Sequence, residues 1–396
     1  MKRYTYILCF VLFISVFITQ PVVGLEKKES SELELTEEAK ASLLLERDSG
    51  LVLYEKNAHE KLPPASMTKV MTLLLVMEAI DTGKLSLDEI VTVSERAASM
   101  GGSQVFLAEG EQMSVEDLIK AVAIASGNDA SVALAERIAG TEEAFVKQMN
   151  EKVKELKLEN TNFKNASGLP AKEHYTTAYD IAIIAKELLK YEEVVTYTEL
   201  YEDYLRKGEE DEFWLVNTNK LVRFHPYVDG LKTGYTKEAK FCLTASAKKD
   251  DMRVVAVVMG ADTAKSRNKM TTNLIDYAFN HYESEKLFDK GEKIATYNHL
   301  QSKKLTYDVR TSEQISLIHK KGEKDTTSYT TDVMINDPIQ MELPVKKGEQ
   351  VGTLTIKKGE ETVIESPLIV QENIDVASYV DLVKRTLQNI AKYKVS

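Results

Sequence analysis

Four short strand-like segments, placed as two pairs far apart in the chain, constrain the fold of this sequence most. The first pair occupies residues 42–46 and 51–56, on either side of the polar turn 47–50. The second pair occupies residues 240–247 and 253–259 and also flanks a polar turn. Each pair predicts a hairpin, and we expect the two hairpins to join in one antiparallel sheet.

Helical periodicity fills the interval between the hairpins and follows the second one. Apolar residues recur at helical spacing in the segments 66–80, 115–125, 130–139, 142–156 and 267–282. Strands at both ends of the region, with helices between them, predict an α/β domain built on a single antiparallel sheet.

The last part of the chain has a different sequence pattern. From about Leu287, short β-rich runs are punctuated by glycine and proline, which predicts a small all-β domain at 287–374. The final segment, 375–396, predicts an amphipathic helix whose apolar residues at helical spacing are Val376, Val380, Val383, Leu387 and Ile390. This helix either packs on its own β domain or a partner, or lies in the membrane surface with the help of anionic lipid.

The N-terminus is typical of an export signal. Lys2 and Arg3 precede an apolar run at 7–18, and the small residues Val22 and Gly24 stand before a cleavage point. We therefore predict a signal peptide at 1–24 and a first folded domain at 25–286. An uncleaved membrane anchor is the alternative, although the apolar run is shorter than the ~20 residues of a spanning helix.

The charge and the cysteine content exclude two further features, nucleic-acid binding and an intrachain disulfide. The formal net charge of -11 argues against nucleic-acid binding, which needs a surplus of clustered Lys and Arg. Of the two cysteines, Cys9 lies in the predicted signal, so Cys242 stands alone in the mature chain and no intrachain disulfide forms. The alternating run around Cys242 predicts a buried, unreactive thiol.

Three short motifs follow one another along the first domain: Ser66-Met67-Thr68-Lys69, Ser126-Gly127-Asn128 and Lys232-Thr233-Gly234. Each is weak alone, because Ser66 after two prolines also suits a helix N-cap and Ser126-Gly127-Asn128 also suits a turn. Together and in this order they are specific for one group of serine acyl-transferases.

The first motif predicts a nucleophile and its base. Ser66 opens a helix, so Lys69 lies one turn further on the same face and its amine can reach the serine hydroxyl. A serine hydroxyl needs a base, and none of the six histidines lies in these motifs. Lys69 must then be neutral part of the time, and we expect the helix terminus and Lys232 to lower its pKa.

The other two motifs predict a substrate cleft. Ser126 and Asn128 fall in a loop between the helical segments 121–125 and 130–139, where one can pass a proton to the leaving amine and the other can hold the substrate backbone. Lys232-Thr233-Gly234 precedes the second hairpin, which places it at a sheet edge where an extended peptide can add as a strand.

The residue types of the third motif suit a peptide that ends in a free carboxylate. Gly234 lets the substrate approach the backbone, and Lys232 and Thr233 offer a cation and a hydroxyl to the carboxylate. The backbone amides of Ser66 and Tyr235 are candidates for an oxyanion hole.

The three motifs, their spacing, the segment Asn165-Ala166-Ser167-Gly168-Leu169-Pro170 and the late β-rich region resemble the low-molecular-mass penicillin-binding D-alanyl-D-alanine carboxypeptidases. The likeness covers residues 35–390. In its overall sequence the chain most resembles the sporulation-associated members of Bacillus-like bacteria. It implies a β-lactamase/transpeptidase-like domain with a helical subdomain, followed by the small all-β domain. It also implies a role for each motif residue: Ser66 as acylated nucleophile, Lys69 as base, Ser126 as proton relay, Asn128 as substrate ligand, and Lys232, Thr233 and Arg267 as carboxylate ligands.

The resemblance implies removal of the last D-alanine from peptidoglycan pentapeptide stems, outside the cytoplasmic membrane. The reaction needs no metal or cofactor, and penicillins would acylate Ser66 as substrate mimics. A β-lactamase is a rival, but the E-x-x-x-N arrangement of class A enzymes does not occur between Asn128 and Lys232. A transpeptidase or endopeptidase on the same fold, and a non-catalytic binder of muropeptides or β-lactams, remain as alternatives.

Overall fold

The computed structural model describes residues 34–322, 329–337 and 341–393, so the predicted signal peptide lies outside the described residues. A five-stranded antiparallel sheet organises the first part of the chain, in the order β2-β1-β9-β8-β7. Its strands are β1 (Ala41–Glu46), β2 (Val52–Lys56), β7 (Val228–Thr236), β8 (Lys240–Lys249) and β9 (Met252–Ala261). β1 pairs with β9, which joins the two predicted hairpins and confirms the single antiparallel sheet.

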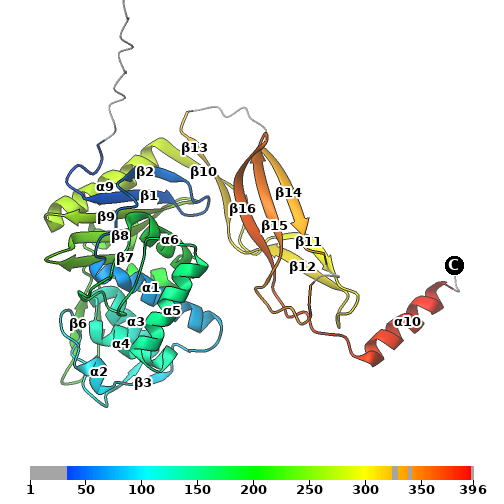
Figure 1. The fold of residues 1–396 in the computed structure, drawn as a ribbon, viewed down its shortest axis with the longest axis horizontal. Coiled ribbons are helices and arrows are strands. Elements are labelled where there is room, and N and C mark those ends of the chain that lie inside the picture. Colours follow the sequence, from blue (N-terminus) through cyan, green and yellow to red (C-terminus); the bar gives the residue numbers. More distant parts are fainter. Residues whose placement is uncertain (1–33, 323–328, 338–340, 394–396) are drawn as a thin grey trace, which may run out of the picture. The chain divides into compact units, whose positions relative to one another are not determined.

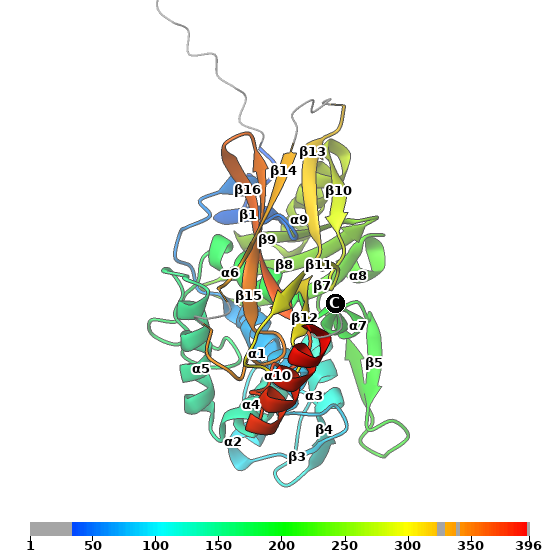
Figure 2. The same ribbon diagram turned by 90° about the vertical axis from the view of Figure 1, so that its right-hand side faces the viewer.

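The period of two along β1 distributes its leucines between two cores. Leu43 and Leu45 contribute to the core shared with α1 (Lys69–Asp81) and α6 (Ala178–Leu188), whereas Leu44 contributes to the core shared with α9 (Ala264–His281). Helices thus cover both faces of the sheet, as the two ribbon views show (Figures 1 and 2). The predicted α/β class is confirmed.

The region between the hairpins contains more elements than the periodicity predicts. Its further helical segments are η1 (Ala65–Thr68), α2 (Glu95–Ala98), α3 (Val115–Lys120), η2 (Ala121–Ala125), α4 (Asn128–Ala139), α5 (Glu142–Glu155), η3 (Glu192–Val194), α7 (Val195–Thr198) and α8 (Leu221–Phe224). Two small two-stranded sheets are inserted among them: β3 (Ile90–Thr92) pairs with β4 (Gln112–Ser114), and β5 (Glu202–Leu205) pairs with β6 (Phe213–Val216).

A second, β-rich part follows α9 without a break. Its strands are β10 (Tyr282–Phe288), β11 (Lys293–Asn298), β12 (Thr306–Thr311), β13 (Ile315–Lys320), β14 (Tyr329–Ile335), β15 (Gln350–Lys358) and β16 (Glu361–Val370). They form a sheet in the order β11-β12-β16-β15-β14 and a separate β10-β13 pair. Buried residues such as Tyr297, Val309 and Leu354 give this part its own hydrophobic core, and the predicted all-β region is confirmed.

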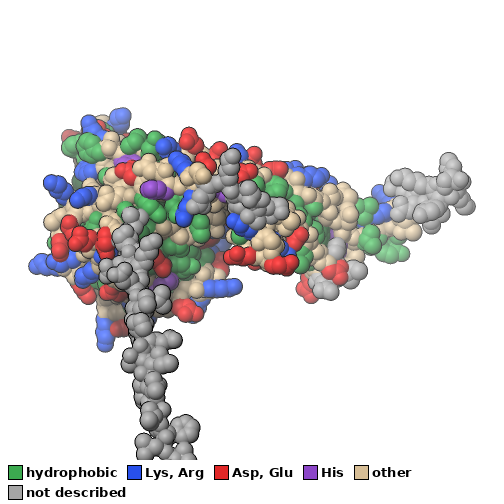
Figure 3. Space-filling view, turned by 90° about the horizontal axis from the view of Figure 1, so that it is seen from above, with side chains coloured by type: hydrophobic (Ala, Val, Ile, Leu, Met, Phe, Trp, Pro, Cys, Tyr) green, Lys and Arg blue, Asp and Glu red, His purple; other side chains and the backbone are tan. Residues whose placement is uncertain are grey.

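The last element is α10 (Tyr379–Tyr393), as the amphipathic pattern predicts. Val380, Val383 and Leu387 on this helix are all exposed, and Figure 3 shows hydrophobic side chains gathered on its described part. Arg385 ties the helix to the β-rich part by donating to the carbonyls of Leu300 and Ser302. Among the described residues, no helix is both long and apolar enough to span a membrane.

Candidate active site

The Ser66 turn begins the site. Ser66 is the second residue of the 3-10 turn η1, which leads into α1 at Lys69. Neither η1 nor α1 has a side-chain N-cap hydrogen bond, so the alternative of Ser66 as a capping residue is wrong. The Ser66 hydroxyl is therefore not committed to holding the helix.

A glycine-dependent contact supports this turn from outside. Gly168 has a φ of +87°, and a Cβ atom there would lie only 1.9 Å from the carbonyl oxygen of Ala65. The Asn165 side chain shapes the bend, because its Oδ1 accepts from the amides of Ser167 (3.2 Å) and Gly168 (2.6 Å). The segment noted for its family resemblance thus packs directly against the backbone that carries Ser66.

Lys69 is the centre of the hydrogen-bond network. Its side chain is completely buried, and its Nζ lies 2.6 Å from Asn128 Oδ1, 2.6 Å from the carbonyl oxygen of Ser167 and 3.2 Å from Ser66 Oγ. A neutral amine has two hydrogens and one lone pair. When both hydrogens are donated to the two near acceptors, the lone pair is left for the Ser66 hydroxyl, so the network orients the amine as a base.

The surroundings also hold Lys69 in the neutral form. Burial lowers the pKa of Lys69 well below its ordinary value of 10.5, and the positive charge of Lys232 lowers it further, while Asp129 acts in the opposite sense. The sequence predicts the part played by Lys232. Burial, rather than the helix terminus named in the sequence analysis, is the largest cause.

Ser126 stands at a strained point of the backbone. It follows the π-helical segment η2 and adopts a left-handed conformation with φ 66° and ψ 31°, which is unusual for a residue other than glycine. Its Oγ is buried and has no hydrogen-bond partner among the described residues. A buried hydroxyl without a partner, held at a strained position, is free to exchange a proton with a bound molecule.

Asn128 corrects the sequence analysis in one respect. The predicted loop holds Ser126 and Gly127, but Asn128 is already the first residue of α4. Its amide spans two segments, because Nδ2 donates to the carbonyl of Gly101 at 2.6 Å while Oδ1 accepts from Lys69. Asn128 therefore holds the Lys69 amine in place and links it to the loop of Gly101.

The third motif lies on β7, which is itself a strand and not only a segment preceding the hairpin. β7 is the edge strand of the five-stranded sheet, so one side of it is unpaired within the sheet, as predicted. A Cβ atom on Gly234 would lie 2.9 Å from the carbonyl oxygen of Pro64, so glycine allows the strand to approach the Ser66 turn. Thr233 Oγ1 donates to Thr218 Oγ1 at 2.7 Å, and Tyr235 is exposed.

Two buried side chains, Lys232 of this strand and Arg267, lie close enough for their positive charges to interact. Lys232 is 1% exposed, and burial followed by the charge of Arg267 lowers its pKa to about 7. Arg267, in the first turn of α9, is 5% exposed, and burial lowers its pKa to about 10. Two buried, mutually repelling cations favour the arrival of an anion such as a carboxylate.

Some contributors have weak or no signals in the sequence. The Ser167 and Gly101 carbonyls act through the backbone, and Thr218 lies in no recognisable motif. Asp129, next to the second motif, accepts from the amides of Val105 and Leu107 and so holds the loop that carries Gly101. The adjacent residues Gly101 and Gly102 are the sequence feature that predicts this loop.

Cys242 completes the predicted side chains and takes no part in this network. It is fully buried and its thiol donates to the carbonyl of Ala239, while burial raises its pKa to about 11. The described residues contain no group of three or more His, Cys, Asp or Glu side chains placed to hold a metal.

Two family models match the chain. The model described as D-alanyl-D-alanine carboxypeptidase matches residues 26–263, and the C-terminal domain of penicillin-binding protein 5 matches residues 282–376. The chain is 49% identical over 394 residues to the D-alanyl-D-alanine carboxypeptidase DacF of Bacillus subtilis, covering 100% of both chains. It is 36% identical over 355 residues to DacC of Escherichia coli, covering 86% of each.

Solved structures agree with these matches. Penicillin binding protein 5 from Haemophilus influenzae is 30% identical, with a TM-score of 0.65 over 86% of this chain and 98% of that one. Penicillin-binding protein D2 from Listeria monocytogenes in its cefotaxime-bound form is 34% identical, with a TM-score of 0.56 over 61% of this chain and 97% of that one. By the length of the matches and the degree of identity, the chain belongs to the D-alanyl-D-alanine carboxypeptidase family of low-molecular-mass penicillin-binding proteins.

Proposed function

We propose that Ser66 and Lys69 carry out the D-alanyl-D-alanine carboxypeptidase reaction on peptidoglycan pentapeptide stems. The observation that carries this proposal is the buried Lys69 amine, whose two near acceptors leave its lone pair for Ser66. Mass spectrometry of a peptide ending in D-Ala-D-Ala tests it directly. Loss of one terminal D-alanine supports the proposal, and an unchanged peptide overturns it.

The proposed chemistry proceeds through an ester. Ser66 Oγ attacks the carbonyl carbon of the penultimate D-alanine as its proton moves to the Lys69 amine, and the backbone amides of Ser66 and Tyr235 stabilise the oxyanion. The C–N bond then breaks, and the Ser126 hydroxyl passes a proton to the leaving amine of the last D-alanine while it takes the proton held by Lys69. Water hydrolyses the ester and restores Ser66.

The terminal carboxylate of the substrate would neutralise the positive charges of Lys232 and Arg267. We assign it to Lys232, Thr233 and Arg267, whose two cations are buried and repel each other in the free protein. A substrate that ends in a free D-alanine meets this requirement for a carboxylate, because its α-carboxylate directly follows the scissile bond. The requirement also suits penicillins, which carry a carboxylate and are expected to acylate Ser66.

We expect kcat/KM to fall as the pH rises above about 7, because Lys232 has a pKa of about 7 in the free protein. Lys232 is cationic below that pH and binds the carboxylate, and it is neutral above it. Lys69 has the opposite requirement, since it must be neutral to act as a base. An arginine keeps its charge at every working pH, so Lys232→Arg should move the alkaline limb of the pH profile upward.

The pH profile of D-alanine release, measured from about pH 5 to about pH 10, checks this assignment. Lys84→Arg, at an exposed position beyond the end of α1, is the matched control and should leave the alkaline limb in place. An alkaline limb that Lys232→Arg does not move would contradict the role of Lys232.

We also propose that the protein is exported, with residues 1–24 removed, and acts at the outer face of the cytoplasmic membrane. The domain boundaries at 25–286, 287–374 and 375–396 belong to the same proposal, which the matches to residues 26–263 and 282–376 support. A role in sporulation stays a prediction from overall resemblance.

The C-terminal helix is proposed to contact anionic lipid. Ala377 is buried and its amide donates to the carbonyl of Gln301, so a deletion of residues 378–396 removes α10 while keeping that contact. We expect the truncated protein to lose its binding to anionic vesicles and to keep its activity on soluble peptide. Co-sedimentation with anionic and with neutral vesicles measures this, and equal binding by both proteins would rule the membrane contact out.

A further inference from the structure

His174 is a buried histidine that the proposed reaction leaves unused. It lies outside the three motifs, is 7% exposed, and lines a cavity of about 610 Å³ beside the Ser66 turn. Its Nε2 lies 2.9 Å from Thr68 Oγ1, whereas its Nδ1 has no hydrogen-bond partner among the described residues. The polar contact of the ring is therefore made to Thr68, which stands between Ser66 and Lys69 in the sequence.

Thr68 depends on this contact because its hydroxyl is not used by the helix. The residue is completely buried and immediately precedes α1, but its side chain makes no capping hydrogen bond to the backbone of that helix. A buried hydroxyl without a partner is unfavourable, so the hydroxyl and the imidazole of His174 are expected to stay together.

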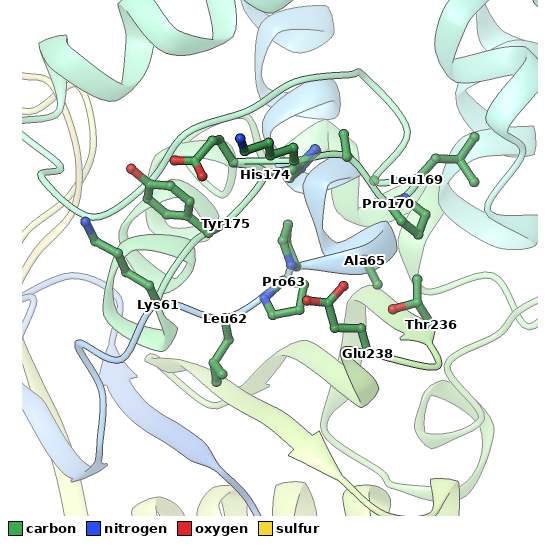
Figure 4. Close-up of a pocket in the computed structure, with 15 residues that line it drawn as sticks. Lys61, Leu62, Pro63, Ala65, Leu169, Pro170, His174, Tyr175, Thr236 and Glu238 are labelled. Carbon is green, nitrogen blue, oxygen red and sulfur yellow. The ribbon is translucent and has the colours of Figure 1, made fainter.

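The backbone that follows His174 holds the chain just before the Ser66 turn. Thr176 exchanges two backbone hydrogen bonds with Leu62, at 2.8 Å and 3.0 Å. Figure 4 shows His174 on one side of the cavity, with Pro63 and Ala65 on the other. The segment around His174 thus binds the turn twice, through the backbone before Ser66 and through a side chain after it.

The loop 163–174, which ends at His174, also carries an acceptor of the Lys69 amine. That acceptor is the carbonyl oxygen of Ser167, 2.6 Å from the Lys69 Nζ. The neighbouring Ala166 carbonyl accepts from Thr72 Oγ1 of α1 at 2.7 Å. At the start of the loop, the Phe163 ring packs edge-on against the His174 ring, with 5.8 Å between their centres. The middle of the loop therefore contacts α1, and His174 fastens its end to Thr68.

The His174 ring makes these contacts without bringing a charge into the site. Burial lowers the pKa of His174 to about 4, and the positive charge of Lys164 acts in the same sense. The ring is therefore neutral near pH 7. It can bind the Thr68 hydroxyl without placing a second cation beside Lys69.

We propose that His174 is a positioning residue for the acylation of Ser66. Its contact with Thr68 holds the Ser66 turn and the loop 163–174 together, and so keeps the Lys69 amine enclosed between its acceptors. This inference rests on the proposed roles of Ser66 and Lys69 and adds a residue that acts through them. Without the contact, the loop and the turn separate more readily and water reaches Lys69.

Two variants remove the contact from opposite sides. His174→Leu and Thr68→Val should each lower the first-order rate constant of penicillin adduct formation at neutral pH by about ten- to a hundredfold, because the nucleophile and its base lose their alignment. The double variant should be no slower than the slower single variant, since both changes break one interaction. This rate constant is read from the molecules that react, so a smaller folded fraction does not alter it.

The pH profile of adduct formation separates positioning from a general loss of stability. Burial is the largest cause of the low pKa of Lys69, so hydration should raise that pKa. Lys69 must be neutral to act as a base, and the acid limb of the profile should therefore move to higher pH in both single variants. Lys232 and Asp129, the charged groups that act on Lys69, are unchanged in them.

A pair of amide variants tests which ring nitrogen matters. The amide of His174→Gln can reach the place of Nε2, and the shorter amide of His174→Asn can reach only the place of Nδ1. We expect the glutamine variant to keep the rate constant and the acid limb of the wild type, and the asparagine variant to behave like His174→Leu. His299→Leu, at a buried histidine of the β-rich part, is the matched control and should change neither measurement.

The outcomes of these measurements distinguish this inference from the proposed function. A wild-type rate constant and acid limb in both His174→Leu and Thr68→Val would overturn the inference and leave the carboxypeptidase function standing. Equal losses in the glutamine and asparagine variants would overturn it too, because the Nε2 contact would then carry no special weight. A wild-type protein that forms no adduct would instead overturn the proposed function, and this inference with it.

Discussion

Replacing Ser66 by alanine is expected to lower D-alanine release by about 10⁴-fold or more and to abolish the covalent penicillin adduct. The substitution removes the hydroxyl oxygen that lies 3.2 Å from the Lys69 amine and is proposed as the nucleophile. Loss of a nucleophile in comparable acyl-transfer enzymes costs about this much, because binding and oxyanion stabilisation alone retain a small residual rate. Mass spectrometry of the intact protein after exposure to penicillin, together with product analysis, measures both effects.

Ser99→Ala is the matched control for this experiment. Ser99 is exposed at the end of α2, where its hydroxyl only donates to the Arg96 carbonyl, so its loss should change neither measurement. A Ser66→Ala protein that still forms the adduct would place the nucleophile elsewhere. A wild-type adduct without peptide turnover would favour a non-catalytic binder or a transpeptidase that needs an acceptor amine. Rapid release of hydrolysed penicillin would favour a β-lactamase.

Replacing Lys69 by alanine is expected to lower the rate of acylation by about 10³-fold or more. General-base catalysis contributes about 10²–10⁴-fold, and here the base also orders the serine hydroxyl. The substitution leaves space where the buried side chain was, beside Asn128 Oδ1 and the Ser167 carbonyl. A small alkylamine added to the solution is therefore expected to enter and restore part of the rate.

The pH dependence of this rescue shows whether Lys69 acts as a general base or only fills space in the site. Only the unprotonated amine has a lone pair, so the restored rate should increase with pH as the added amine loses its proton. Tetramethylammonium, which has the charge but no lone pair, is the control and should not rescue. Rescue by both compounds, or an unchanged acylation rate in Lys69→Ala, would contradict the role of Lys69 as base.

The sheet could be predicted because its hairpins keep a simple pattern. Residues 42–56 and 240–259 alternate or run apolar around polar turns, and the structure pairs them as expected. β7 lacks this pattern, because Asp229, Lys232 and two glycines interrupt its apolar positions. α6 carries a capping signal in the sequence, because Thr177 precedes it and accepts from the Asp180 amide.

The residues of the site could be predicted from the sequence, but the hydrogen bonds that connect them could not. The helical spacing of Ser66 and Lys69 was enough to predict that the two side chains meet. No spacing rule indicates that the Lys69 amine also binds the carbonyl of Ser167, because that contact depends on the path of the whole chain. The left-handed conformation of Ser126 could not be predicted from the sequence either, because serine has no preference for it.

The partners of the Lys69 amine have a consequence for how the protein matures. Asn128 and Ser167 are 59 and 98 residues away from it in sequence, so the amine is surrounded only after distant segments have come together. An incompletely folded chain would keep an ordinary, protonated lysine and an inert serine. Labelling by a fluorescent penicillin would then count native molecules rather than total protein, and the rate at which label appears during refolding would report when the last long-range contacts of the domain are made.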